Sequence, residues 1–234
     1  MRMNKDSLEN HRQLERSVHA LTWGTHLTNI YRSKEEKLAV VVAYLEIGLK
    51  RNERCLHIDC YQNQVEICQR LADFKINVKE CLDSGRLVFL SKEQSYLQDN
   101  YFSPARMMQM ISEAHYETLK AGFYGLRGSG DLSWISQNYP GVKGVIDYEH
   151  ELNLFLRRSR LMAFCHYNEE EVPEDFLASA LCTHPKAFIY GRLYDNPYYI
   201  NSDTFAQMLS EERPVGDYEQ LRDNIIQKKK EFPG

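Results

Sequence analysis

Short apolar segments alternate with longer amphipathic ones along most of the chain after Gly24, and this alternation constrains the fold more than any other feature. Runs such as THLTNIY (25–31) and RCLHIDC (54–60) have the length of buried strands. SKEEKLAVVVAYLEIGLKRN (33–52), between them, has the apolar spacing of a helix. Strands separated by helices predict βαβ units, and hence an α/β fold: a three-layer, doubly wound, mostly parallel sheet.

The remaining segments continue this pattern. Further strands are expected at 86–91, from 123 onward and at 161–168, and further helices at 63–74, 104–122, 141–159 and 173–184. The segment 186–200 reads as a pair of strands, which predicts an antiparallel hairpin at one edge of the sheet.

Charged, helix-like segments stand at both ends of this pattern. The expected organisation is an N-terminal helix in 1–23, an α/β domain over 24–202 and a helical extension over 203–234. The terminal helices, 4–21 and 217–231, are candidates for homodimer formation or partner docking, or simply pack on the domain. Both interpretations stay open.

Composition excludes several classes of protein. The chain has 234 residues, 43% of them hydrophobic, a net charge of -4 and a pI near 6.1. Nothing in this balance indicates nucleic-acid binding, and no apolar run reaches membrane-spanning length. The N-terminus has no apolar core of a signal peptide, and the six cysteines form no CxxC pair. We therefore expect a cytoplasmic protein with reduced thiols and no direct contact with nucleic acid or membrane.

The turn between the first strand and its helix is where many nucleotide-binding folds hold phosphate. Here it reads Tyr31-Arg-Ser-Lys-Glu-Glu36, without glycine and without Gly-Lys-Ser/Thr. Ser33 and Glu36 have the spacing of a capping box, which satisfies the helix donors internally. Glu35 and Glu36 also place negative charge against the helix start. The turn therefore argues against phosphate binding, although Arg32 or Lys34 could hold a smaller anion instead of being solvated.

The segment LRGSGDLSW (126–134) is the most suggestive candidate for a site. Arg127, Asp131 and Trp134 follow an apolar run, and together they would line the mouth of a pocket with polar and aromatic groups. In a nucleoside triphosphatase, an acidic residue at such a strand end would hold magnesium. The competing interpretation is a glycine-rich turn in which Asp131 caps the next turn.

Other polar residues are weaker candidates. In DYEHELN (147–153), the pairs Asp147/Glu151 and Glu149/Asn153 each share a helix face, which suits acid/base chemistry but is also common on surface helices. Cysteines and histidines end two strands and could gather into a metal or haem site, yet their spacing matches no known ligand pattern and favours core packing. These residues are His57, Cys60, Cys165 and His166, with His184 before Pro185 at a helix end. No nucleophile elbow is present, so no catalytic residue and no metal ligand is predicted.

Taken together, GTHLTNIYRSKEEKLAVVVAYLEIGLKRNERCLHID, LRGSGDLSW, GVKGVIDYEHELN, FCHYN and THPKAFIYGRLYDNPYYI resemble the MEDS domain, the methanogen/methylotroph, DcmR sensory domain. The resemblance runs from about Gly24 to Ile200. It implies a degenerate relative of the RecA/KaiC nucleoside triphosphatases that has lost its phosphate loop. Asp131 departs from the glutamate usual in the family. The family pattern is otherwise met at Trp134, Tyr148, Glu149, Asn153, Cys165, Tyr167, His184, Pro185, Asn196, Pro197 and Tyr198.

The resemblance implies a non-catalytic sensor of a small molecule, a C1 compound or hydrocarbon derivative, that regulates transcription or signalling. Family members often carry a DNA-binding or kinase module; none is recognised here, so we expect the output to pass through a partner protein. The alternatives are a RecA/KaiC-type nucleotide or phosphoryl enzyme with an atypical site, and a metal, haem or thiol redox sensor. No cofactor is required. The predicted ligand-binding residues are Arg127, Asp131, Trp134, Tyr148, Glu149, Cys165, Tyr167, His184 and Tyr198.

Overall fold

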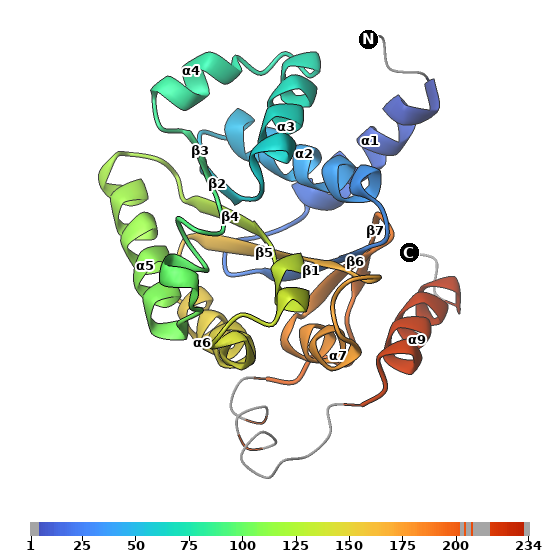
Figure 1. The fold of residues 1–234 in the computed structure, drawn as a ribbon. Coiled ribbons are helices and arrows are strands. Elements are labelled where there is room, and N and C mark those ends of the chain that lie inside the picture. The colour runs from blue at the N-terminus through green and yellow to red at the C-terminus, as the bar shows by residue number, and fades with distance from the viewer. Residues whose placement is uncertain (1–4, 202–203, 205–206, 208–215, 232–234) are drawn as a thin grey trace.

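The structure is a computed structural model that describes residues 5–201, 204, 207 and 216–231. Its centre is a seven-stranded sheet with the order β3-β2-β4-β5-β1-β6-β7 (Figure 1). Every strand pair is parallel except β6 with β7. The strands are β1 (His26–Tyr31), β2 (Arg54–Ile58), β3 (Leu87–Leu90), β4 (Leu126–Asp131), β5 (Leu161–Asn168), β6 (Lys186–Ile189) and β7 (Arg192–Asp195). The predicted mostly parallel sheet and its antiparallel edge hairpin are confirmed.

Helices cover both faces of this sheet and complete the three layers (Figure 1). One face carries α1 (Lys5–His19), α2 (Lys34–Lys50), α3 (Tyr61–Asp73) and α4 (Val78–Asp83). The other carries α5 (Pro104–Lys120), α6 (Val145–Leu156), α7 (Glu174–Thr183) and α9 (Tyr218–Glu231). Short 3-10 turns lie at Gln98–Asn100, Ser133–Gln137 and Val142–Gly144. Among these described helices, none combines the length and apolar character needed to cross a bilayer.

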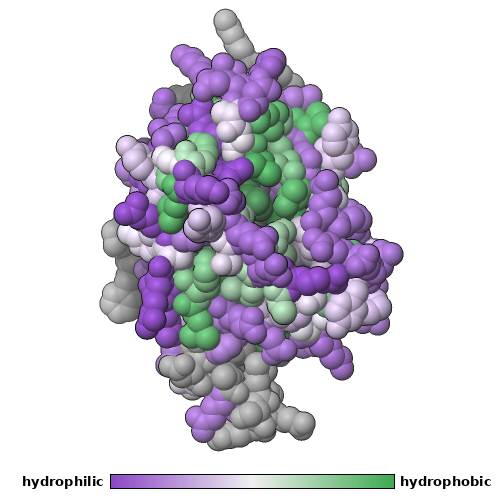
Figure 2. Space-filling model, turned by 90° about the vertical axis from the view of Figure 1, so that its left-hand side faces the viewer, coloured by the Kyte–Doolittle hydropathy of each residue, from purple (hydrophilic) through white to green (hydrophobic). Residues whose placement is uncertain are grey.

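Two hydrophobic cores lie on opposite sides of the sheet. The first packs α2 against α1 and includes Leu14, Leu38 and Phe164. The second packs α5, α6 and α7 against the sheet and includes Tyr96, Trp134 and Leu152. Viewed from the side of the β3 edge, strips of hydrophobic residues reach the surface between hydrophilic ones (Figure 2). The central strands are buried by both cores, and β1 is buried at every position.

The structure corrects the sequence-based elements in three places. The short helix α4 was not predicted. The helix expected over 141–159 begins only at Val145, because Gly141 has φ 84° and packs against the Phe102 carbonyl. The expected glycine-rich turn is wrong, since Gly128 and Gly130 lie inside strand β4. The capping role expected of Asp131 is confirmed, because its Oδ1 accepts from the Ser133 N–H at 3.0 Å, where the next 3-10 turn begins. Tyr96 explains Gly130: a Cβ there would lie 2.0 Å from the tyrosine hydroxyl.

The predicted division into three segments stays a prediction. The N-terminal helix exists as α1, and it packs on α2 of the domain. Within the expected extension over 203–234, the structure describes residues 204, 207 and 216–231, which include α9.

Candidate functional site

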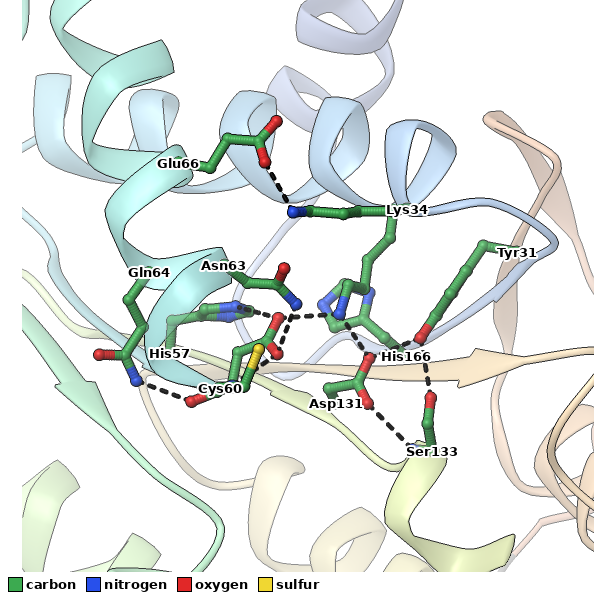
Figure 3. Close-up of polar contacts among 12 residues, drawn as sticks. Tyr31, Lys34, His57, Cys60, Asn63, Gln64, Glu66, Asp131, Ser133 and His166 are labelled. Atoms are coloured by element: carbon green, nitrogen blue, oxygen red, sulfur yellow. Dashed lines mark hydrogen bonds and ion pairs between the residues drawn. The ribbon is translucent and has the colours of Figure 1, made fainter.

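Polar side chains gather where β1, β2 and β4 end, beside the first turn of α2 (Figure 3). Lys37 Nζ donates to Asp59 Oδ2 and to Asp131 Oδ2, each at 2.9 Å. Tyr31 Oη donates to Asp131 Oδ2 at 2.7 Å and lies 2.8 Å from Ser133 Oγ. We call Tyr31, Lys37, Asp59, Asp131 and Ser133 the strand-end cluster. It joins three strand ends to one helix start through a shared ammonium group.

The charges of the strand-end cluster stabilise one another. Burial alone would lower the pKa of Lys37, but the carboxylates of Asp131 and Asp59 outweigh it and raise the pKa above its ordinary value. Burial would likewise raise the pKa of Asp59, but the hydrogen bond and charge of His57, together with Lys37, hold it far below its ordinary value. Burial and the neighbouring Asp131 raise the pKa of Tyr31. Lys37 and Asp59 are therefore charged and Tyr31 is a neutral donor at pH 7.

A chain of polar groups runs from this cluster into the sheet. His57, beside the cluster in Figure 3, has Nε2 3.5 Å from Asp59 Oδ2. His57 Nδ1 lies 3.0 Å from Ser129 Oγ. Ser129 Oγ lies 2.7 Å from His166 Nε2, whose Nδ1 is 3.1 Å from Asn29 Nδ2. Burial and the neighbouring His57 lower the pKa of His166, so that ring is neutral. The floor of the site is thus a fixed, buried network.

The strand-end cluster opens into a pocket of about 650 Å³. That volume is in the range of small-molecule sites. Two lysines that line it already have partners within the protein: Lys34 Nζ lies 2.8 Å from Glu66 Oε2, and Lys92 Nζ donates to Gln137 Oε1 at 3.1 Å. The other lining residues include Cys60, Tyr61, Asn63, Ser91, Glu93, Trp134, Asn168 and Glu171.

The start of α2 is closed by its own residues, as its sequence predicts. Ser33 Oγ accepts a hydrogen bond from the Glu36 N–H at 3.2 Å. The Glu36 carboxylate accepts from the Arg32 N–H at 2.9 Å, one residue earlier than a standard capping box. Lys37 stands where a P-loop places its phosphate-binding lysine, after the first strand and in the first turn of its helix. Here two carboxylates hold that lysine.

A second group of polar side chains is buried between β1, β5, α6 and α7. Glu149 Oε2 lies 3.1 Å from His26 Nε2 and 3.5 Å from His184 Nε2. Cys165 Sγ lies 3.5 Å from His26 Nε2 and 3.6 Å from Glu149 Oε2. Tyr167 Oη donates to Glu149 Oε1 at 2.6 Å. We call His26, Glu149, Cys165 and His184 the buried cluster; each of the four is at most 3% exposed.

Burial controls the protonation of this second group. Burial and the neighbouring His26 lower the pKa of His184 to about 3, so its imidazole is neutral at pH 7. Burial alone would raise the pKa of Glu149, but His184, His26 and Tyr167 hold it to about 2. Burial and Glu149 raise the pKa of the Cys165 thiol well above its ordinary value.

The predicted ligand-binding residues therefore fall into separate places. Asp131 and Trp134 line the strand-end pocket. Glu149, Cys165, Tyr167 and His184 meet around the buried cluster, where the structure adds His26. Tyr148 and Cys165 line a narrow apolar cavity of about 30 Å³ between β4, β5 and α5.

Arg127 and Tyr198 are not part of either group. Arg127 Nε donates to Glu53 at 2.6 Å, and its guanidinium stacks over Tyr44 in the core beside α2. The expectation that Arg127 and Asp131 line one pocket is therefore wrong, because Arg127 lies in the buried first half of β4. Tyr198 lies under Lys228 of α9.

The surface interpretation of DYEHELN holds for only one of its two pairs. Asp147 and Glu151 are exposed, but Glu149 and Asn153 are buried. Sequence reasoning also missed Tyr31, Lys37 and Asp59. Two signals could have revealed this cluster: a lysine in the first turn of a helix, and carboxylates at the ends of β2 and β4.

The topology and the strand-end site define a RecA/KaiC-like α/β fold. A KaiC-like protein from the hyperthermophilic archaeon Pyrococcus horikoshii OT3 is similar in structure, with a TM-score of 0.50 and 10% sequence identity over 71% of each chain. A search of curated proteins found no significant match. The family model for MEDS, the methanogen/methylotroph, DcmR sensory domain, matches residues 25–185. The chain belongs to the MEDS family and is a sensory domain.

Proposed function

We propose that this domain senses a small molecule bound in the strand-end pocket, without catalytic turnover, and reports it to a partner protein. The observation that carries the proposal is the neutralisation of Lys37 by Asp59 and Asp131. A pocket of this size remains, but its central cation already has two anionic partners inside the protein.

The charge balance disfavours a polyphosphate. One ammonium and two carboxylates leave the strand-end cluster with an excess of negative charge, which repels phosphate oxygens. One of the α2 donors that a phosphate would need, the Glu36 N–H, already donates to Ser33 Oγ, and Glu35 and Glu36 add negative charge at the same helix end. A nucleotide would have to displace these internal partners.

The same groups suit a small neutral or cationic ligand. Asp131 accepts hydrogen bonds, Tyr31 and Ser133 carry hydroxyl groups, and Trp134 supplies an aromatic wall. A C1 compound or small hydrocarbon derivative with a hydroxyl or amino group matches this chemistry and agrees with a sensory role. We propose that class as the ligand.

A route from the pocket to the surface passes through Glu169. Its carboxylate accepts from Arg32 Nε at 2.7 Å, from the Tyr218 hydroxyl at 2.7 Å and from Arg222 Nη1 at 2.6 Å. Arg32 directly follows Tyr31 of the cluster, whereas Tyr218 and Arg222 belong to α9. A ligand that moves Tyr31 would therefore change how α9 docks, and we propose α9 as the surface that a signalling or transcription partner reads.

Ligand screening on matched variants tests this proposal. Thermal-shift and calorimetric titrations with C1 alcohols, amines and their short homologues should raise the Tm of the wild type. Asp131→Asn should lose that shift, whereas Asp147→Asn, an exposed aspartate on α6, should keep it. Hydrogen exchange in α9 should change with ligand in the wild type alone. A ligand that binds both variants equally, or leaves α9 exchange unchanged, contradicts the proposed site or output.

A nucleotide enzyme is the second candidate, favoured by the place of Lys37 in the first turn of α2. It requires steady hydrolysis of MgATP that Lys37→Met abolishes while circular dichroism stays unchanged. The sensor proposal predicts no hydrolysis by either protein.

A further inference from the structure

The buried cluster brings together two imidazoles, a thiol and a carboxylate from four separate elements. His26 begins β1, Glu149 lies in α6, Cys165 lies in β5 and His184 directly follows α7. One ligand atom from each lies within 4.8 Å of all the others. Neither the fold nor the strand-end pocket requires such a convergence, so it calls for its own explanation.

The outer nitrogen of each histidine is held as a donor. Asn153 Nδ2 donates to the carbonyls of Glu149 at 3.1 Å and Thr183 at 2.8 Å, which turns Asn153 Oδ1 toward His26 Nδ1 at 3.1 Å. His184 Nδ1 lies 2.7 Å from the Ala180 carbonyl, which can only accept. Both Nδ1 atoms therefore carry hydrogen, and both Nε2 atoms point into the cluster toward Glu149 Oε2.

The cluster leaves one buried nitrogen unpaired: His184 Nε2 has no hydrogen-bond partner although its side chain is fully buried. Glu149 Oε2 accepts from the Cys165 thiol at 3.6 Å and faces His26 Nε2 at 3.1 Å, so this oxygen, the sulfur and both Nε2 atoms converge on one point. Tyr167 satisfies only the other oxygen of Glu149. Histidines that donate Nδ1–H to a carbonyl while their Nε2 atoms converge are the usual arrangement around a bound metal.

We infer that the buried cluster is a divalent transition-metal site, with Zn²⁺ as the best match, bound by His26, Glu149, Cys165 and His184. In tetrahedral Zn²⁺ sites the bonds are about 2.0–2.3 Å, which places neighbouring ligand atoms about 3.3–3.8 Å apart. Four of the six distances between these atoms run from 3.1 to 3.6 Å, and all six are within 4.8 Å. Small side-chain shifts complete the tetrahedron.

The donor set selects the class of metal. Two imidazole nitrogens, a sulfur and a carboxylate oxygen suit Zn²⁺ and its first-row neighbours and do not suit Mg²⁺ or Ca²⁺, which prefer oxygen ligands. Binding replaces the proton of the Cys165 thiol, which passes to the buffer, and forms a metal–thiolate bond with no change in oxidation state. The metal would tie β1, β5, α6 and α7 together beside the small cavity that Cys165 also lines.

Cobalt substitution tests the site directly. The full chain, stripped with a chelator and verified as folded by circular dichroism, is titrated with Co²⁺ and then with Zn²⁺. The expected result is one Co²⁺ per chain, with tetrahedral visible bands and a near-ultraviolet thiolate band that Zn²⁺ removes. Zn²⁺ should also raise the Tm of the stripped protein, since it binds the folded state.

Three variants separate this site from adventitious binding. Cys165→Ser should lose the thiolate band, and Cys68→Ser, at a partly buried cysteine of α3, should keep it. His184→Gln, which preserves much of the side-chain volume, should weaken Zn²⁺ binding at least tenfold. This second variant keeps the test valid if Cys165→Ser does not fold. A folded wild type that binds neither metal at unit stoichiometry, or a His184→Gln variant with unchanged affinity, overturns the inference. Either outcome leaves the strand-end proposal untouched.

Discussion

The strand-end cluster and the buried cluster both gather charged groups from several elements, but they satisfy those groups differently. Around Lys37 the donors and acceptors pair with one another: its ammonium lies between Asp59 and Asp131, and Tyr31 donates to Asp131. Around Glu149, by contrast, the fully buried His184 Nε2 has no hydrogen-bond partner. The central cation of the first cluster is thus already paired, whereas the second cluster leaves an unpaired nitrogen among four groups that can ligate a metal.

This difference assigns the two regions different roles. In the proposed ligand pocket, Lys37 is already paired with two carboxylates, so a ligand need not supply a missing charge. An unsatisfied, enclosed cluster gains most from a tightly bound ion, since a buried unpaired polar group is costly. On these two proposals, the domain combines a small-molecule pocket at the carboxyl ends of its strands with a metal site in its core.

The largest expected effect is on the buried cluster. Glu149→Ala should lower the free energy of unfolding by about 3–5 kcal/mol, because it removes the carboxylate that accepts from the buried Tyr167 hydroxyl and that faces both histidine rings. Glu151→Ala, at an exposed position two residues along α6, should change it by no more than about 0.5 kcal/mol. Urea denaturation followed by circular dichroism measures both. If the two variants lose the same free energy of unfolding, the buried cluster stabilises the fold no more than an exposed glutamate does.

The strand-end cluster should respond less to losing one carboxylate, because the other remains. Asp59→Asn should cost about 1.5–3 kcal/mol, the range for a hydrogen bond to a charged group. The pKa of Asp59 is lower in the folded state, so its contribution is present above its ordinary value of 3.8 and is lost as the pH falls below it. Wild type and variant should therefore converge in stability at acid pH. If the difference in unfolding free energy between wild type and Asp59→Asn stays constant from pH 7 to pH 3, the pairing of Asp59 with Lys37 is contradicted.

Strand β4, which ends at Asp131 of the strand-end cluster, offers a matched pair of glycines. Gly130→Ala should cost about 1–3 kcal/mol, because the new Cβ would lie 2.0 Å from the Tyr96 hydroxyl. Gly128→Ala should be neutral or slightly stabilising, since its Cβ would meet Met162 and Leu161 only at 3.6 and 3.7 Å. Thermal melts of the two variants test whether the close approach of Tyr96 is the reason for Gly130.

The smallest expected effect concerns the start of α2. Ser33→Ala should lower stability by about 1 kcal/mol through loss of the cap to Glu36. Ser136→Ala, at an exposed position, serves as the control. If both cost the same in chemical denaturation, the self-capped helix start is not a stabilising feature.

Sequence alone predicts the layers of this fold because strand and helix periodicities differ over most of the chain. It fails at Gly128 and Gly130, which signal a turn locally but belong to a strand because Tyr96 packs over Gly130. That contact joins distant parts of the chain, so no local pattern reveals it.

The two clusters were predictable to different extents. Glu149 has helical spacing from Val145 and Leu152, both buried, and this spacing could have placed it inward. Its neighbour Glu151 falls on the exposed face of the same helix. His26 carried no such signal, because both faces of β1 are buried and alternation is lost. The burial of Lys37 could not be predicted, because a charged side chain is usually exposed and this one is buried only through carboxylates that follow or end two other strands.

The central claim is that Asp59 and Asp131 occupy Lys37, the lysine that would otherwise bind phosphate at the strand-end site. Isothermal titration of the wild type with MgATP tests this claim most directly. The account predicts no saturable heat, corresponding to a Kd weaker than about 1 mM, and no change in Tm. Micromolar binding of MgATP that Lys37→Met removes would contradict it, because Lys37 would then be free to hold phosphate despite Asp59 and Asp131.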